Sequence, residues 1–403
     1  MKILMLIPYL PYPPSEGGQL RSYKLIKLLS QHHDITLVCF SRQHNTPQQI
    51  NHMRQFCKKI IVIERGQTWT IPNILRTGLS PYPFLISIYY SSQTKKILET
   101  ELRDQKYDLI HAEMFYTLPY LPKNHTPTIL VEQTIMSRNF GHYIDTQKKF
   151  WLKPFMWIDV AKIHFWEKYF WQKVDRVVAV SKEDAAVISH MVPGIQVDIV
   201  PNGVGEDVSN LPKALHYNHH VLYMGNYKWI DNWEAANILA TQVFPLIKAK
   251  IPDATLTIAG QFPTPDVKSL ANRQLDISVL ELKENDFAGV VNAYKRSGLL
   301  VAPMYAPGGT RLKILAAMAA MIPVVTTPIG AEGYDAVNGE SILTGQTPTD
   351  IAARAIEVFQ DQALYKKIAQ NARVLVDTKF SWEPIAKKLE SIYEQIVTSQ
   401  PRI

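Results

Sequence analysis

A segment in the last third of the chain places glycines, a hydroxyl and a predicted helix start in an order that suits anion binding. In Pro303–Met321 (PMYAPGGTRLKILAAMAAM), a strand-like run ends at Ala302, Gly308-Gly309 form a loop, and a helix is predicted to begin near Thr310. Backbone N–H groups at a helix start are unpaired and lie at the positive end of the helix dipole, so they attract anions. We expect Thr310 to cap this helix and also to reach a phosphate oxygen.

Two cations follow the same loop. Arg311 and Lys313 add what we expect to be fixed positive charge beside the helix start. A diphosphate matches this combination of backbone donors and cations, whereas the alternative is an ordinary capped helix with basic residues on its surface.

Glycine also occurs in two other loops that connect a predicted strand to a predicted helix. Gly17 and Gly18 precede the first predicted helix, and Gly225-Asn226 end the apolar run Val221–Met224, with Lys228 just beyond. Glycine in such a loop lets a ligand approach the backbone closely. Because all three loops are expected at the carboxyl ends of strands, together they favour one ligand-binding cleft.

Other kinds of site have weaker support. Gly203-x-Gly205 lacks the third glycine of a dinucleotide fingerprint, and no Gly-Lys-Ser/Thr phosphate loop occurs. The nearest approach to an Asp-x-Asp metal pair is Glu284-x-Asp286, which a solvated loop explains better. The two cysteines cannot form a disulfide framework, and no Cys/His cluster has zinc spacing. Asp108 and His111 lie at the predicted strand Leu109–His111 and are candidates for polar groups of the cleft. For His111 the alternative is a hydrogen-bonded histidine in the core.

Strand–helix alternation predicts the fold. The predicted strands of the first half are Lys2–Pro8, Ile35–Phe40, Ile60–Ile63, Leu109–His111, Thr128–Val131, Val177–Val180 and Val197–Val200; those of the second half are Val221–Met224, Thr255–Ala259, Leu299–Ala302 and Val324–Thr326. Short apolar runs separated by helical spacing indicate a parallel sheet with helices on both faces. The turn cluster Pro201-Asn202-Gly203 separates the two series.

We therefore predict an α/β protein with two doubly wound, Rossmann-like domains facing a central cleft. The first spans residues 1–200 and the second 201–380. A terminal helix within 381–403, with apolar positions that include Ile385 and Tyr393, is expected to pack back on the first domain.

Charge is uneven between the two halves. The total is 43 Lys+Arg against 36 Asp+Glu, and residues 1–200 hold 24 and 16 of these, so the excess of cations lies in the first half. Within it, residues 148–176 (KKFWLKPFMWIDVAKIHFWEKYFWQKVDR) interleave aromatic and basic side chains. That composition suits an anionic membrane surface, although a core helix with an exposed basic face and nucleic-acid stacking are alternatives. We expect no nucleic-acid partner, and a cytoplasmic protein that binds peripherally at the inner face of the membrane.

The chain resembles the family 4 glycosyltransferases, in the branch of bacterial exopolysaccharide-type sugar transferases. The resemblance covers nearly the whole chain and rests on the opening KILMLIPYLPYPPSEGGQLRSYKLIKLLS, on VDRVVAVSKED and IVPNGV, and on VLYMGNYKWIDNWEAANIL, PDATLTIAG, APGGTRLKILAAMAAMIPVVTTPIGAEG and FSWEPIAKKL. It implies a GT-B fold and a retaining, metal-free hexosyl transfer. The nucleotide-sugar donor, UDP- or GDP-linked, would be a substrate bound by the second domain, no cofactor is expected, and the first domain would take a glycan or lipid-linked glycan acceptor.

The resemblance also assigns roles to residues. Gly17 and Gly18 would approach the donor phosphate or sugar, Arg311 and Lys313 would neutralise the leaving diphosphate, and Gln133 would contact the transferred sugar. Charge on a leaving group is what such cations stabilise. Two glycine loops complete the expected donor site: Gly225-Asn226, with Lys228, and Gly308-Gly309-Thr310.

Three positions depart from the family pattern. A Glu-x7-Glu pair is common in relatives, and Gly308 and Ala316 stand in its place here; the second Glu accepts hydrogen bonds from the ribose. Its loss forfeits about 1.5–3 kcal/mol, or roughly 10–150-fold in donor affinity. Gln133 replaces a frequent His and cannot act as a general base. An active hexosyltransferase is thus expected, with a catalytically impaired binding or scaffolding partner as the alternative; a phosphorylase-like enzyme lacks a recognisable pyridoxal phosphate lysine.

Overall fold

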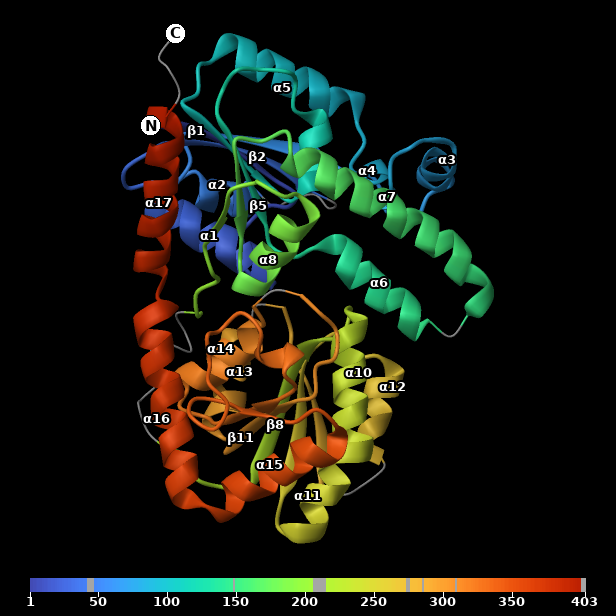
Figure 1. Cartoon of the computed structure of the whole chain (residues 1–403), viewed down its shortest axis with the longest axis vertical. Helices are drawn as coiled ribbons and strands as arrows, with labels where there is room; N and C mark the ends of the chain where they lie inside the picture. Colours follow the sequence, from blue (N-terminus) through green and yellow to red (C-terminus); the bar gives the residue numbers. More distant parts are fainter. Residues whose placement is uncertain are drawn as a thin grey trace. The chain divides into compact units, whose positions relative to one another are not determined.

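The computed structural model describes residues 1–41, 47–147, 149–205, 215–272, 276–284, 286–308 and 310–399. They form two compact units, one of Met1–Pro201 with Ile385–Ile403 and one of Asn202–Pro384 (Figure 1). Among the described helices, none is long and apolar enough to cross a membrane.

The first unit is built on a seven-stranded parallel sheet in the order β3-β2-β1-β4-β5-β6-β7. Its strands are β1 (Lys2–Ile7), β2 (Asp34–Ser41), β3 (Lys59–Glu64), β4 (Leu109–Glu113), β5 (Thr128–Glu132), β6 (Arg176–Ala179) and β7 (Val197–Ile199). The order reverses at β1, which pairs with both β2 and β4. In such sheets the crevice at the carboxyl ends of the strands on either side of this reversal is the usual ligand site.

The helices of the first unit connect these strands. They are α1 (Gly17–Leu29), α2 (Pro47–Met53), α3 (Ile71–Leu79), α4 (Phe84–Ser87), α5 (Ser92–Asp104), α6 (Met136–Thr146), α7 (Lys153–Trp171) and α8 (Lys182–Met191), with 3-10 turns η1 (Phe115–Tyr120) and η2 (Phe150–Leu152). Along β1, Leu4 and Leu6 join a core cluster that also takes Leu98 of α5 and Ile163 of α7. Strand residues point alternately to the two faces of a sheet, so β1 is buried on both sides, as its uninterrupted apolar run predicts.

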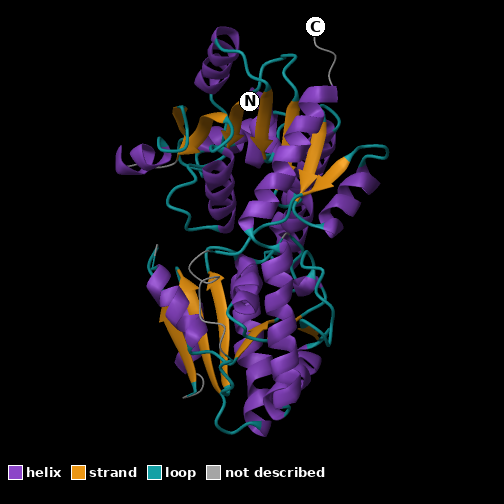
Figure 2. Ribbon diagram, turned by 90° about the vertical axis from the view of Figure 1, so that its left-hand side faces the viewer, coloured by secondary structure: helices purple, strands orange, loops and turns teal. Residues whose placement is uncertain are grey.

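The second unit has a six-stranded parallel sheet in the order β10-β9-β8-β11-β12-β13. Its strands are β8 (His220–Asn226), β9 (Thr255–Gln261), β10 (Ile277–Glu281), β11 (Leu299–Ala302), β12 (Val324–Thr326) and β13 (Leu343–Thr344). Here the order reverses at β8, which pairs with β9 and β11. Strands β10 and β13 were not anticipated, and the two doubly wound α/β folds are otherwise as the sequence predicts (Figure 2).

Helices cover both faces of the second sheet. They are α10 (Ile230–Ile238), α11 (Phe244–Lys250), α12 (Pro265–Lys268), α13 (Phe287–Lys295), α14 (Leu312–Ala319), α15 (Pro348–Gln360) and α16 (Gln362–Lys379), with short turns η3 (Leu239–Val243), η4 (Ser269–Asn272) and η5 (Ile329–Ala331). Val221 and Tyr223 of β8 pack with α10, α11 and α15, whereas Leu222 packs with α13, α14 and α16.

The last helix, α17 (Trp382–Ser399), begins in the second unit and continues in the first. At its start, the Trp382 indole donates to the carbonyl of Val204 at 2.7 Å. A Cβ on Gly203 would lie 2.6 Å from that ring, so glycine is required for the packing. Beyond Ile385 the apolar stripe is buried, and Tyr393 reaches the ring of His111 in β4.

Candidate active site

A cluster around Lys313 lies at the strand reversal of the second unit. Lys313 is in the first turn of α14, and its ammonium donates to the Tyr223 hydroxyl at 3.0 Å and to the Asn232 side-chain oxygen. It also lies 3.9 Å from the sulfur of Met304, which follows β11. Strands β8 and β11 and helices α10 and α14 thus converge on one amine.

The charge of this amine depends on pH. Burial is the main cause that lowers the pKa of Lys313 to about 7; nearby Asp231 opposes the shift and Arg311 adds to it. Burial therefore works against the fixed positive charge that the sequence suggests for Lys313. An anion bound beside Lys313 would favour the charged form and raise this pKa again.

Arg311 has a different environment from Lys313. It is buried, and its guanidinium donates to the carbonyl oxygens of Ala306 at 2.5 Å and Ile329 at 2.9 Å. The Tyr334 hydroxyl donates in turn to the Arg311 carbonyl at 2.8 Å. These contacts make Arg311 a support for the loop before α14, a role that the sequence gave no sign of.

The loop itself differs from its expected geometry. Helix α14 begins at Leu312 with Arg311 as its N-cap, so Thr310 does not cap it. The Thr310 hydroxyl is buried and, within the described residues, has no hydrogen-bond partner. Gly308 has φ +133°, a conformation that an L side chain rarely adopts, so the glycine fits its place in this loop. Gly309 lies outside the described residues.

Position 316, which carries no charge, lies on the same face of α14 as Lys313. Ala316 is half-buried in α14, three residues after Lys313, and residues with this spacing lie on one helix face. No carboxylate therefore accompanies the lysine on this face at position 316.

The glycine loop after β8 adjoins the Lys313 cluster. A Cβ on Gly225 would lie 3.1 Å from that of Asn232, and the Asn232 amide donates to the backbone oxygen of Asn226 at 2.9 Å. A Cβ on Gly260, at the end of β9, would lie 1.7 Å from the Gly225 oxygen. The two strand ends therefore meet backbone to backbone.

Lys228 lies in a separate part of the second unit's strand ends. Its ammonium is 3.5 Å from the centre of the Phe262 ring and 3.7 Å from a carboxylate oxygen of Glu284. A hollow here is lined by Phe262 and residues 281–284. The structure therefore brings Gly225 and Asn226 to the Lys313 cluster but gives Lys228 other neighbours.

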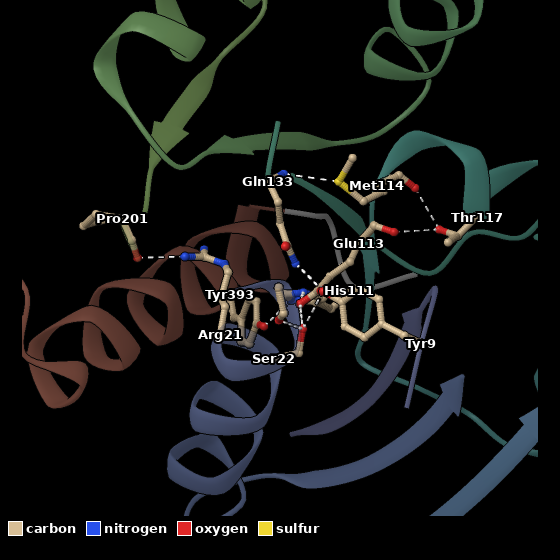
Figure 3. A network of polar contacts seen from close by, with 11 residues as sticks. Tyr9, Arg21, Ser22, His111, Glu113, Met114, Thr117, Gln133, Pro201 and Tyr393 are labelled. Atoms are coloured by element: carbon tan, nitrogen blue, oxygen red, sulfur yellow. Dashed lines mark hydrogen bonds and ion pairs between the residues drawn. The ribbon is translucent and has the colours of Figure 1, made fainter. Parts of the chain in front are cut away.

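The first unit has its own polar network at its strand reversal (Figure 3). The carboxylate of Glu113, at the end of β4, is buried and receives the Ser22 hydroxyl at 2.7 Å, the Gln133 amide at 2.7 Å and the Tyr9 hydroxyl at 3.2 Å. Tyr9 follows β1, Gln133 follows β5, and Ser22 is in α1. Burial, together with the charge of Glu113, raises the pKa of Tyr9, so its hydroxyl stays protonated.

This network restricts what Gln133 can do. Its amide nitrogen donates both to Glu113 and to the Tyr9 oxygen, each at 2.7 Å, which uses its two hydrogens. Only its carbonyl oxygen then remains to meet a ligand, as an acceptor. A Cβ on Gly18 would lie 2.5 Å from that oxygen, so glycine is required there; Gly17, beside it, is exposed at the start of α1.

Two further polar candidates lie in β4 or just before it. His111 is buried, with its Nδ1 2.5 Å from the Tyr393 hydroxyl and its Nε2 3.7 Å from Glu113, and so belongs to the core. Asp108, at the amino end of β4, accepts the backbone N–H of Lys2 at 2.7 Å. Among the described residues, no group of three or more His, Cys, Asp or Glu side chains could hold a metal ion.

Sequence reasoning missed the partners of its own candidates. Tyr9 and Glu113 hold Gln133, and Ser22 holds Glu113, while Tyr223, Asn232 and Met304 surround Lys313. The available signal was position: Tyr9, Glu113 and Met304 each stand at or just after the carboxyl end of a strand beside the reversal of its sheet.

Comparison with known proteins extends over both units. Residues 16–208 match the family model described as Glycosyltransferase Family 4, and residues 218–361 match Glycosyl transferases group 1. An uncharacterised 44.6 kDa protein of the cps region of Klebsiella pneumoniae is 21% identical over 404 residues, covering 98% of this chain and 99% of its own.

Solved structures of low identity share the fold. Sucrose-phosphate synthase from Thermosynechococcus elongatus matches with a TM-score of 0.71 at 17% identity, over 99% of this chain and all of its own. HepE of Anabaena, solved in complex with UDP and glucose, matches with a TM-score of 0.63 at 15% identity, over 98% of this chain and all of its own.

Proposed function

The chain belongs to the family 4 glycosyltransferases with a GT-B fold, and on that premise we propose that it is an active, retaining, metal-independent hexosyltransferase. Its donor would be a UDP- or GDP-linked hexose, and its acceptor a cell-envelope or exopolysaccharide glycan, free or lipid-linked. The cps-region relative and the UDP and glucose named for HepE support this choice of donor and product class. We place the reaction in the cytoplasm.

The observation that carries the proposal is the Lys313 cluster with its neighbouring loop. An amine with a pKa near 7, a buried Thr310 hydroxyl that has no partner among the described residues, and the start of α14 all lie in one short segment. Each would be satisfied by a diphosphate: the lysine would gain a proton and a counter-charge, and the hydroxyl an acceptor. Arg311 would act through the loop that it holds.

The same groups would serve the chemical step. When the bond between the anomeric carbon and the diphosphate breaks, the bonding electrons stay on the phosphate oxygen. A protonated Lys313 would stabilise that charge, an effect that typically contributes about 10²–10³ in rate for one donor. The acceptor oxygen would bond to the anomeric carbon on the face that the diphosphate leaves, and its proton would pass to the leaving phosphate.

The environment of Glu113 in the first unit argues against a role as nucleophile or base, and this supports the proposed route. Glu113 is buried and already accepts from Ser22, Tyr9 and Gln133, so it is poorly suited to attack a sugar or remove a proton. Gln133 would instead accept a hydrogen bond from a hydroxyl of the transferred sugar. A proton acceptor on the phosphate removes the need for a protein base.

A second candidate function has one observation in its favour. Ala316 leaves the Lys313 face of α14 without the carboxylate that relatives use for the ribose, as expected for a catalytically impaired GT-B protein that acts as a binding or scaffolding partner. Ala316→Glu separates the two cases. An active enzyme transfers sugar with Ala316 in place. An impaired protein would show no transfer with Ala316, and Ala316→Glu would raise its nucleotide affinity roughly 10–150-fold.

The direct test is a panel of UDP- and GDP-hexoses assayed with the full chain. Calorimetry should detect binding of at least one nucleotide, and chromatography should detect free UDP or GDP when a glycan acceptor is present. If none of the panel binds at millimolar concentration, the proposed donor site is wrong.

A further inference from the structure

The first unit exposes large apolar side chains in only two of its described segments. These are Trp69, Ile71, Ile74, Leu75, Leu79 and Tyr90 in and around α3, and Phe150, Trp151, Phe155, Trp157, Ile158, Phe165 and Tyr169 in η2 and α7. In the second unit such residues are scattered singly over many elements, from Leu215 to Val374. Single exposed apolar residues are ordinary, but a concentration of this size indicates an interaction surface.

Helix α3 has the reverse of the usual orientation. Ile71, Ile74, Leu75 and Leu79 have the spacing of one helix face, yet all four are exposed, Leu79 by 86%, and α3 has no buried residue. Its polar side faces the protein instead: the Arg76 guanidinium lies 4.1 Å from the centre of the Tyr90 ring. A soluble surface helix would bury the apolar face, so this one lacks its partner.

Helix α7 with η2 carries a second exposed stripe. Trp151, Phe155, Ile158, Phe165 and Tyr169 follow each other at helical spacing, and Phe155 is exposed by 70%. The buried residues of α7, which include Ile163 and Trp171, lie at other positions around the helix. Both core packing and the exposed stripe are thus present on one helix.

Specific contacts tie the two elements together. The Lys162 ammonium of α7 donates to the carbonyl oxygens of Thr77 and Ser80, at the end of α3, at 2.6 and 2.8 Å. The Trp166 indole donates to the Pro81 oxygen at 3.0 Å. The two exposed stripes therefore belong to one rigid part of the first unit, which we name the α3/α7 face.

The α3/α7 face exposes basic side chains, whereas the acidic side chains of α7 bond within the unit. The acidic residues of α7 are both used internally: Asp159 accepts the backbone N–H of Phe84, and Glu167 accepts those of Met136 and Ser137. Lys168 and Lys173 are exposed, and residues 65–98 contain no Asp or Glu. The α3/α7 face thus presents apolar and cationic groups, and its acids point inward.

We propose that the α3/α7 face binds the surface of an anionic lipid bilayer. Tryptophan, tyrosine and lysine beside aliphatic side chains are the groups that settle at a headgroup boundary, with the apolar side chains in the acyl region and the ammonium groups among the phosphates. The positive charge selects an anionic membrane over a neutral one. This inference uses residues of the first unit alone, so it stands whether or not the proposed donor site is correct.

The test uses the full chain and vesicles of two compositions, phosphatidylcholine alone and phosphatidylcholine with phosphatidylglycerol. Sedimentation should carry the protein with the anionic vesicles, more weakly with the neutral ones, and less as salt rises. The double variant Ile74→Gln/Leu79→Gln should bind the anionic vesicles about tenfold more weakly, since two exposed apolar groups no longer enter the lipid. Lys168→Glu should weaken binding at low salt by about fivefold or more.

Matched controls separate this surface effect from a folding defect. Val337→Gln/Val374→Gln changes two exposed apolar residues of the second unit and should leave vesicle binding unchanged. Brominated lipid should quench the exposed tryptophans of this face, so Trp69→Phe/Trp151→Phe should reduce the quenching to the contribution of Trp157, while Trp229→Phe, also exposed but in the second unit, should leave it unchanged.

Two results would overturn the proposal. One is an absence of sedimentation with anionic vesicles at low ionic strength. The other is a concentration-dependent dimer that Ile74→Gln/Leu79→Gln abolishes in the absence of any vesicle binding, because the α3/α7 face would then be a contact between two copies of the chain.

Discussion

The Glu113 network and the Lys313 cluster lie at the strand reversals of their two sheets, yet their polar groups are satisfied to different degrees. In the first unit Glu113 is surrounded by donors from β1, α1 and β5, and each hydrogen of the Gln133 amide has an acceptor. In the second, burial lowers the pKa of Lys313, and the Thr310 hydroxyl has no partner among the described residues. Satisfied buried networks fix a geometry, whereas unsatisfied groups gain most from a ligand.

Substitutions in the Glu113 network and around Lys313 should affect different properties of the protein. Substitutions in the Glu113 network should reduce stability first, because they leave buried groups without partners. Substitutions around Lys313 should reduce ligand affinity first, because the free protein gains little from these groups. The same kind of change is therefore expected to have separate consequences in the two units.

The largest effect is expected for Lys313→Met. Loss of the ammonium removes a donor to the leaving diphosphate, and kcat/KM for sugar transfer should fall by about 10²–10³. Steady-state kinetics with the donor identified by the nucleotide panel measure this. Lys366→Met, an exposed lysine of α16, is the matched control and should retain wild-type rates; equal losses in both variants would contradict a role for Lys313.

Next in size is Glu113→Gln. The amide would keep one acceptor oxygen but turn the hydrogens of its NH2 group toward groups that already donate, so the free energy of unfolding should fall by about 2–4 kcal/mol. Thermal unfolding should show a lower midpoint for the first unit, with nucleotide affinity unchanged. Glu99→Gln, an exposed residue of α5, should shift the midpoint little. A full-length protein that keeps its midpoint would refute the idea that this network is tightly satisfied.

Nucleotide affinity should depend on pH through Lys313. Its pKa is about 7 in the free protein and should be higher in the nucleotide complex, because the diphosphate favours the charged amine. Binding then takes up a proton above pH 7: affinity is full below the free pKa and declines as pH rises through it, by about tenfold between pH 7 and 8.5. Calorimetry in buffers of different ionisation enthalpy measures the uptake, which Lys313→Met should abolish. Affinity that stays flat over this range would argue against the coupling.

The smallest effects form a pair. Thr310→Val removes a hydroxyl without a described partner, so stability should change by less than about 0.5 kcal/mol while nucleotide affinity falls about 3–10-fold. Ser22→Ala removes a donor to buried Glu113 and should cost about 1–3 kcal/mol of stability. Denaturant unfolding and calorimetry on both variants give the comparison. A Thr310→Val protein that is as destabilised as Ser22→Ala would remove the distinction between the units.

Much of the fold followed from pattern alone. Apolar runs such as Lys2–Ile7 and Leu299–Ala302 have few alternatives in an α/β chain, and their positions match the observed strands. Strand β10 was missed because Ile277–Glu281 alternates exposed and buried positions at an edge, where the apolar signal is weak. Strand β13 has only two residues.

The candidate site was less accessible from the sequence. Glycine loops and cations mark positions along the chain, but the partners of Lys313 come from β8, α10 and the segment after β11. Desolvation, which lowers the pKa of this lysine, depends on packing that no local motif records. The start of α14 was misplaced for the same reason: Arg311 is held by Ala306, Ile329 and Tyr334, and these contacts leave Thr310 outside the helix.

The most direct test of the central claim is the titration of Lys313 itself, followed by NMR of lysine-labelled full-length protein with Lys313→Arg to assign the signal. We expect a pKa near 7 in the free protein and a rise of at least one pH unit when UDP or GDP binds. An ordinary lysine pKa in the free protein, or nucleotide binding that leaves the Lys313 titration unmoved, would contradict it.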